Sequence, residues 1–231
     1  MSVLKDPEDI LVEFLRSKIT DPRGRYTSET DYFVATQGQT IFTLTPATSS
    51  YLVRCITQIN KNGNKLLKWQ DYNVDLTGKR IVLTNGATSL DEVNVTYSSS
   101  ASGEEWIYPD FPIATLGQSK FPRISIMTVN MTSDRQGGNH SSYLNRIQFQ
   151  IDVWVKDNYE YVYNSHNYNK QELANHLGFK VMLSFKDGID DLYTKLFDED
   201  GLAFGPFPYD DETQTFRHKQ ELALSSINAG E

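Results

Sequence analysis

The sequence predicts an α+β protein, an antiparallel sheet flanked by helices, with an all-β sandwich inserted into it. Three observations indicate this fold class. An amphipathic helix opens the chain, and residues 28–103 then show only short β-type runs broken by turn signals. After residue 104 a strictly alternating strand is followed by a second amphipathic helix. We therefore expect residues 1–27 and 104–231 to form one domain and residues 28–103 to form the insert.

The opening helix has clear start and stop signals. Asp6 is placed to act as N-cap, with Pro7 at the first helical position. Asp21 precedes Pro22, and the residue before a proline is pushed out of the helical region. One apolar stripe results, made of Ile10, Leu11, Phe14, Leu15 and Ile19. This stripe has no partner before residue 105, so we expect it to pack on the later sheet and helix.

The middle of the chain has the short alternating runs and turn signals that are typical of a β-sandwich. Asn62-Gly63 is a strong hairpin signal, because both residues tolerate positive φ. Val93, Val95 and Tyr97 alternate with polar residues, as expected of a half-buried strand. The stretch ends in residues 98–103, SSSASG, which have the composition of a flexible linker.

The clearest strand in the chain covers residues 146–155. Its apolar set, on one face, is Ile147, Phe149, Ile151, Val153 and Val155. Before it, residues 131–142 are polar and predict a long loop with Gly137-Gly138 at the tip. After it, a helix is predicted from about Asn169, interrupted at Asp187-Gly188, with a short second helix over 189–197. Residues 198–212 are predicted to be a loop and 216–227 a last strand.

Composition excludes several function classes. The chain has 22 Lys and Arg against 30 Asp and Glu, a formal charge of -8, which argues against gripping nucleic acid. Its one cysteine, Cys55, allows no intrachain disulfide and is expected to be a buried core thiol. No apolar run is long enough to span a membrane, and the N-terminus lacks the features of a signal peptide. Catalytic, metal-ligating and cofactor-binding motifs are absent from the sequence, so we expect no enzyme, metal or cofactor.

Two features suggest an assembly surface. The polar face of the alternating strand carries a tryptophan and an arginine, which are favoured interface anchors, although a solvated face is the alternative. The interface candidates are Arg146, Gln148, Gln150, Asp152 and Trp154. The polar loop is the second feature, since long loops in compact domains are usually functional or disordered. Its candidate contact residues are Arg135, Gln136, Gly137, Gly138, Asn139 and His140.

The same segments resemble a known family. An initial helix, Phe121-Pro122-Arg123-Ile124 at a strand start, and the strand Arg146–Val155 before an amphipathic helix are similar to the tail-terminator or tail-completion (neck) proteins of long-tailed bacteriophages. The inserted part resembles the small β-sandwich decoration domains of phage tail and fibre proteins. Gln37-Gly38, Asn62-Gly63 and Asp71-Tyr72 are among the residues that carry this second resemblance. The terminator family does not normally carry such an insert.

The resemblance implies a virion protein without catalysis. Six copies would form a homohexameric ring that caps the head-proximal end of the tail tube and contacts the tail tube protein and the head connector. DNA would pass through the lumen without specific binding, and assembly would take place in the host cytoplasm. No membrane is implied.

Two other functions stay open from the sequence. One is a neighbouring neck protein, such as a head-completion protein. The other is a tail-associated binding module whose sandwich recognises a carbohydrate or a host-surface partner. For that module Trp69, Tyr72 and Tyr51 are the aromatic residues proposed to stack on sugar rings, although aromatics in sandwiches mostly belong to the core.

Overall fold

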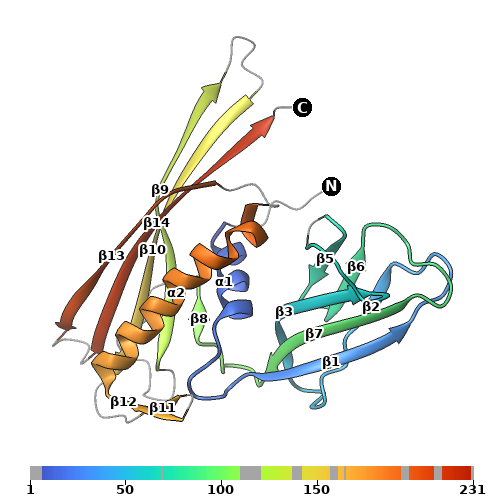
Figure 1. Ribbon diagram of the computed structural model, residues 1–231, viewed down its shortest axis with the longest axis horizontal. Helices are drawn as coiled ribbons and strands as arrows, with labels where there is room; N and C mark the ends of the chain where they lie inside the picture. The colour runs from blue at the N-terminus through green and yellow to red at the C-terminus, as the bar shows by residue number, and fades with distance from the viewer. Residues whose placement is uncertain are drawn as a thin grey trace. The chain divides into compact units, whose positions relative to one another are not determined.

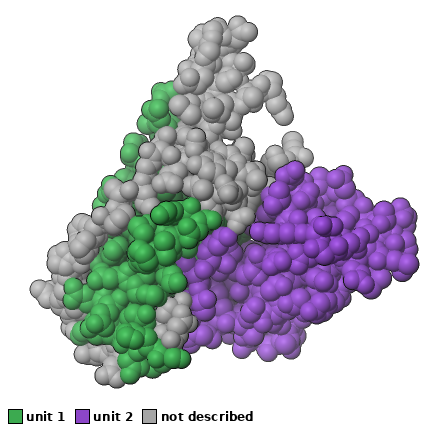
Figure 2. All heavy atoms as spheres, viewed as in Figure 1, with its two compact units in different colours: residues 1–15, 106–231 green, residues 16–105 purple. Residues whose placement is uncertain are grey.

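A computed structural model of the chain describes residues 7–68, 70–109, 121–136, 142–156, 161–163, 165–193, 198–210 and 215–229. In this part the protein is mixed α+β, with two helices and mostly antiparallel sheets (Figure 1). The chain divides into two compact units. Unit 1 comprises Met1–Leu15 and Trp106–Glu231, and unit 2 is the continuous segment Arg16–Glu105 (Figure 2). The divisions therefore fall after residues 15 and 105, where the sequence suggested residues 27 and 103.

Unit 2 consists of two antiparallel sheets. One has the order β1-β7-β3-β4, and the other has the order β2-β6-β5. The bounds are β1 (Thr27–Val34), β2 (Ile41–Thr43), β3 (Leu52–Lys61), β4 (Asn64–Lys65), β5 (Tyr72–Asp75), β6 (Arg80–Leu83) and β7 (Glu92–Ser100). Both sheets contribute to one apolar core, with Phe42 and Ile81 from the smaller sheet and Ile59, Val95 and Tyr97 from the larger. Cys55 is buried, as the sequence predicts.

The hairpin signal at Asn62-Gly63 is confirmed. Both residues have positive φ, 50° and 80°, in the turn that joins β3 to β4. The Asn62 side chain donates to Asp91 Oδ1 at 2.7 Å, and the backbone N–H of Thr88 donates to Asp91 Oδ2 at 2.8 Å. These hydrogen bonds hold the pKa of the Asp91 carboxyl well below its usual range. The carboxylate thus ties two turns of unit 2 together.

The prediction of a flexible linker at residues 98–103 is wrong for its first half. Ser98, Ser99 and Ser100 end strand β7, and Ser99 and Ser100 are fully buried. The Arg54 guanidinium donates to Ser100 Oγ at 2.7 Å and to the Ala101 carbonyl at 2.7 Å, and it forms an ion pair with Glu105. A composition typical of linkers is therefore ordered here by a buried cation that no local pattern reveals.

Unit 1 is built on a five-stranded sheet with the order β13-β14-β10-β9-β8. All neighbours are antiparallel except β8 and β9. The bounds are β8 (Ile107–Tyr108), β9 (Arg123–Gln136), β10 (Ser142–Lys156), β13 (Asp198–Asp210) and β14 (Thr215–Ala229). A small hairpin, β11 (Tyr161–Tyr163) and β12 (His166–Tyr168), precedes the second helix.

Two helices belong to this unit, α1 (Pro7–Lys18) through its residues up to Leu15, and α2 (Lys170–Tyr193). The Phe14 and Phe185 rings stack with centroids 5.4 Å apart, and Glu8 Oε1 accepts the Thr128 N–H at 2.6 Å. The opening helix therefore contacts both α2 and β9. The predicted Asp6 cap lies outside the described residues.

The start of α2 is the one that the sequence predicts. Asn169 Oδ1 accepts the Glu172 N–H at 2.9 Å, while Glu172 Oε2 accepts the Asn169 N–H at 3.1 Å, which is a capping box. One side of the helix is buried and contacts β10 and β14 (Figure 1). Its buried large side chains are Leu173, Leu177, Val181 and Phe185.

Two predictions for the C-terminal part are wrong. Helix α2 continues through Asp187-Gly188 to Tyr193, because a glycine costs a helix only about 1 kcal/mol and the helix is long. Residues 198–210 form strand β13 and not a loop. Prolines such as Pro206 and Pro208 occur within sheets mainly on edge strands, and β13 is the edge strand beside β14.

Helix α2 and strand β14 approach closely at Gly178. A Cβ atom placed on Gly178 would lie 2.2 Å from Cδ2 of His218, whose ring is buried. Gln220, also buried, donates from its side chain to the Gly178 carbonyl, and His218 Nδ1 lies 3.4 Å from Asn175 Oδ1. The glycine that weakens the helix pattern is therefore the point at which the helix docks on the sheet.

We expect Gly178→Ala to lower the free energy of unfolding by about 1–3 kcal/mol, because the added methyl group overpacks the His218 ring. The gain in helix propensity, about 1 kcal/mol, is smaller than this cost. Urea unfolding measures the effect. In the double variant with His218→Ala the loss should be smaller than the sum of the single losses, and an unchanged or raised stability of Gly178→Ala would contradict the close approach.

Stability should also fall as the pH drops below about 6.5, the ordinary pKa of histidine. Burial lowers the pKa of His218, outweighing the opposite effect of Asp152, and burial also lowers the pKa of His176. Because the unfolded chain then binds more protons than the folded one, stability decreases from pH 6.5 downward. Urea midpoints between pH 5 and 8 test this, and His218→Gln should flatten the slope. An equal slope in that variant would contradict the assignment.

Candidate assembly surface on the sheet of unit 1

Strand β10 has the two faces that its alternation predicts, and its apolar face is buried from Ile147 to Val155. The polar face is divided into two halves. Arg146 and Gln148 are exposed, Gln150 is half-buried, and Asp152 and Trp154 are buried. The five interface candidates therefore share one face of one strand, but only the half nearer the start of β10 is accessible in the chain.

The buried half is an internal polar cluster. Asp152, only 1% exposed, accepts hydrogen bonds through Oδ2 from Gln150 Nε2 and from Arg217 Nη2, each at 2.7 Å. Trp154 donates from Nε1 to Ser125 Oγ at 2.8 Å. Its ring lies under the Arg217 guanidinium, with Cζ 4.7 Å from the ring centroid. These contacts join β9, β10 and β14 inside one chain, which makes Asp152 and Trp154 part of its own packing.

The cluster extends to the edge of the sheet. Arg217, Trp154 and Arg123 lie side by side in register on β14, β10 and β9. The Arg123 guanidinium is buried and lies 3.7 Å from the centroid of the Tyr108 ring on β8. Guanidinium groups over aromatic faces are attracted by the ring quadrupole, most strongly when they are desolvated. This half of the face therefore holds four strands together.

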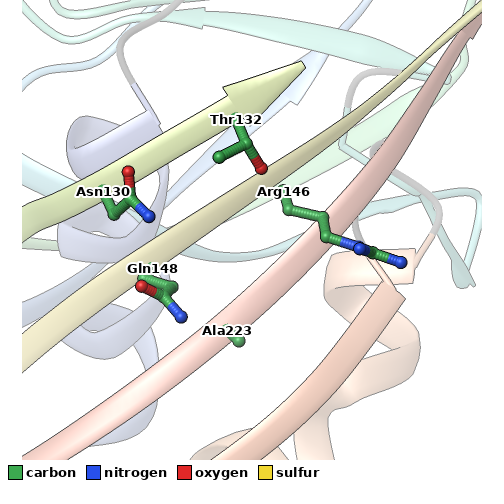
Figure 3. A pocket seen from close by; sticks show the side chains of 5 residues that line it. All are labelled: Asn130, Thr132, Arg146, Gln148 and Ala223. Atoms are coloured by element: carbon green, nitrogen blue, oxygen red, sulfur yellow. The ribbon is translucent and has the colours of Figure 1, made fainter. Parts of the chain in front are cut away.

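The exposed half contains a shallow depression of about 330 Å³. Its lining comes from three adjacent strands, with Asn130 and Thr132 on β9, Arg146 and Gln148 on β10, and Ala223 on β14 (Figure 3). The residues meet because Gln148 pairs with both Asn130 and Ala223 and Arg146 pairs with Thr132. Arg146 is the only charged residue among these five. The depression offers amide, hydroxyl and guanidinium groups to a partner.

The predicted loop at residues 131–142 is wrong for most of its length. Residues 131–136 belong to β9 and Ser142 to β10, and pairing continues to Gln136 opposite Ser142. Arg135 and Gln136 are therefore strand residues. The candidates Gly137, Gly138, Asn139 and His140 lie outside the described residues. Polar residues such as Thr132, Ser133 and Asp134 form a strand here because β10 supplies a hydrogen-bonding partner for the segment.

The two edges of the sheet differ. Strand β8 covers β9 only at Ile124 and Ser125, and Glu8 accepts the N–H of Thr128. From Val129 onward no other strand in the described part of the chain pairs with this edge, and the Val129 and Met131 side chains are 56% and 60% exposed. The β13 edge, in contrast, carries two prolines and two register shifts, which oppose pairing with another strand. The β9 edge beside the depression is thus the one suited to strand addition.

The sequence alone missed most residues of this surface. Asn130, Thr132 and Ala223 join the depression through strand register, which the sequence does not specify. The sequence predicts that Arg217 lies in the last strand, on the face opposite His218. Nothing in the sequence pattern indicates its ion pair with Asp152. Ser125 and Arg123 are likewise identified only by their contacts with Trp154 and Tyr108.

Among the residues that the structure describes, no group of three or more His, Cys, Asp or Glu side chains is placed to hold a metal ion. His166 and His176 both contact the Tyr168 ring, at centroid distances of 4.5 and 4.9 Å. Among the described residues, these two histidines belong to no group of three potential metal ligands. The two helices that the structure describes are too short or too polar to cross a membrane. Neither the scan against protein-family models nor the search of curated proteins finds a match for the chain.

The two halves of the polar face should respond differently to truncation. Trp154→Ala is expected to lower the free energy of unfolding by about 3–5 kcal/mol, because a buried ring and its packing are lost. Gln148→Ala, on the exposed half, should change it by less than about 0.5 kcal/mol. Urea unfolding followed by far-UV circular dichroism measures both. Similar losses in the two variants would show that the division into halves is wrong.

Proposed function

We propose that the chain is a structural, non-catalytic subunit of a ring that caps the head-proximal end of a phage tail tube and joins it to the head connector. In this proposal unit 1 is a tail-terminator-like domain and unit 2 is a β-sandwich inserted into it. The contacts of Phe14 with Phe185 and of Glu8 with Thr128 support it, because they join the opening helix to the C-terminal part of unit 1.

The observation that carries the proposal is the accessible half of the polar face beside the edge of β9, which no other described strand covers from Val129 onward. Three strands present the depression around Arg146 and Gln148, and from Val129 onward no other strand of the described residues pairs with the outer edge of β9 next to it. A surface on one side of a subunit that binds a different surface of the next copy is heterologous, and it closes into a ring when the rotation per subunit is suitable. We assign this surface to the contact between neighbouring subunits.

Charge supports a role next to DNA without binding it. Each copy carries a formal charge of -8, so a ring of six has a large negative charge that repels phosphate groups. A lumen without an attractive counter-surface lets DNA slide past. The partners in this proposal are further copies of the chain, the tail tube protein and the head connector. A neighbouring neck protein of the head-completion type is the closest alternative.

Imaging of the virus particle that contains this chain tests the proposal. We expect cryo-electron microscopy to show six copies in one ring at the head-proximal end of the tail, with Arg146 and Gln148 at the contact between neighbouring copies. Six or twelve copies one layer nearer the head would favour the head-completion alternative. Copies at the distal tip, or none in the particle, would refute the proposal.

A charge reversal tests the surface itself. Arg146→Glu with Gln148→Glu should reduce the number of heads joined to tails while leaving the urea midpoint of the purified chain unchanged, because both side chains are exposed. The matched control is the same net change of charge on α2, Lys186→Glu with Gln171→Glu, because both of these side chains are also exposed. Normal joining by the double variant would contradict the assigned interface.

A further inference from the structure

The outer face of the larger sheet of unit 2 has an unusual composition. Along β1 the side chains alternate, so that Asp31 and Phe33 are partly covered while Thr30, Tyr32 and Val34 are exposed. Tyr32 is 76% exposed, among the most exposed large apolar or aromatic residues that the structure describes. Its ring therefore stands on the face opposite the apolar core.

Strand register places polar side chains beside this ring. Tyr32 pairs with Asn94 on β7, and Asn94 pairs with Asn60 on β3, so the three form one row across the sheet. The next row consists of Thr30, Thr96 and Gln58 in the same order. Two hydrogen bonds link the side chains of this grid, Thr30 Oγ1 to Thr96 Oγ1 at 3.1 Å and Gln58 Nε2 to Asn60 Oδ1 at 3.0 Å.

The grid is free of charge. Its six members, Tyr32, Asn94, Asn60, Thr30, Thr96 and Gln58, are all neutral, although 23% of the residues in the chain are charged. One exposed carboxylate, Glu92, borders the grid on the same face of β7, where it pairs with Val34. A surface that binds nucleic acid or an acidic or basic peptide needs charged groups for complementarity. A neutral partner rich in hydroxyl groups matches it better, because asparagine and glutamine side chains both donate and accept hydrogen bonds.

The aromatic ring adds an apolar element in a fixed place. Tyr32 and Val34 are neighbours on the exposed side of β1 and form an apolar strip next to the amides. The inward residues of the same strand anchor it, since the Thr45 N–H donates to Asp31 Oδ2 at 2.7 Å and the Ala47 N–H donates to Glu29 Oε2 at 2.6 Å. A ring held on an ordered strand loses little freedom when it binds a ligand.

We infer that this face, with Tyr32 as its platform, binds a neutral oligosaccharide. A pyranose ring has one apolar face of C–H groups and a rim of hydroxyl groups. The apolar face stacks on the Tyr32 ring, and the hydroxyl rim reaches the amides of Asn94 and Asn60 in the same row. This site is independent of the ring contact proposed for unit 1, because it involves no residue of that unit.

The inference replaces the aromatic residues suggested by the sequence. Tyr72 is buried in the core of unit 2, and Tyr51 is only half exposed. Trp69 lies outside the described residues. The sequence gives no signal for Tyr32, because Asn60 and Asn94, which lie beside it on the sheet, are distant from it in the chain. Only the pairing of β1, β7 and β3 brings them together.

The experiment uses the full-length chain and an array of neutral oligosaccharides: glucans, mannans, galactans and N-acetylglucosamine oligomers. The wild-type chain should bind at least one of these classes, and isothermal titration then gives its affinity. Tyr32→Ala should weaken binding by about three- to tenfold or more, while Tyr32→Phe, which keeps the ring, should retain most of it. Asn94→Ala should weaken binding as well, because it removes hydrogen bonds to the hydroxyl rim.

The matched control is Phe179→Ala, which removes another exposed aromatic side chain, on helix α2 of unit 1, and should leave the affinity unchanged. Melting temperatures of all variants confirm that they are folded. The inference is overturned if the wild-type chain binds none of the neutral oligosaccharides at millimolar concentration. It is also overturned if Tyr32→Ala and Asn94→Ala bind as tightly as wild type. Neither result bears on the ring at the tail.

Discussion

The ion pair between the buried Asp152 and Arg217 favours one register between β10 and β14, the two strands on which the sheet of unit 1 is centred. A slip of one residue between β10 and β14 would move every side chain to the opposite face of the sheet. It would also leave a buried carboxylate without its cation, which is strongly destabilising. In this register Arg217 lies over the Trp154 ring, and the pairing of β9 with β10 and β8 brings Ser125 to Trp154 and Arg123 to the Tyr108 ring. The same pairing determines which residues of β9, β10 and β14 lie next to one another on this face.

The same register creates the accessible half of the face. Because Arg146 is opposite Thr132 and Gln148 is opposite Asn130, polar side chains from β9 and β10 meet above the small Ala223 of β14. On the other side of the sheet, Gly178 lets α2 approach His218 and cover the apolar residues of β10. One face is thus used for packing inside the chain, while part of the other stays accessible to solvent. In unit 2 the larger sheet likewise packs one face on the apolar core and presents mostly polar side chains, Glu92 among them, on the other.

Local pattern was sufficient where the signal lay within a few residues. The alternation over Arg146–Val155 gave the strand and its two faces, Asn169 and Glu172 marked the start of α2, and Asn62-Gly63 marked a hairpin. Pattern failed where a distant partner decides the outcome. The polar residues of 131–136 and the proline-containing residues of 198–210 became strands because β10 and β14 pair with them. The serine-rich end of β7 was ordered by Arg54 in the same way.

The sequence by itself determined the α+β class, the helical stripes and which residues of the alternating strand face the core, since these follow from short-range periodicity. Tertiary structure decided which half of the polar face is buried and which residues line the depression. It also decided that Tyr32, and not Tyr72, is presented to solvent in unit 2. The physical reason is that both surfaces are assembled from neighbouring strands. Their register depends on buried contacts such as Asp152 with Arg217, between residues that are distant in the chain.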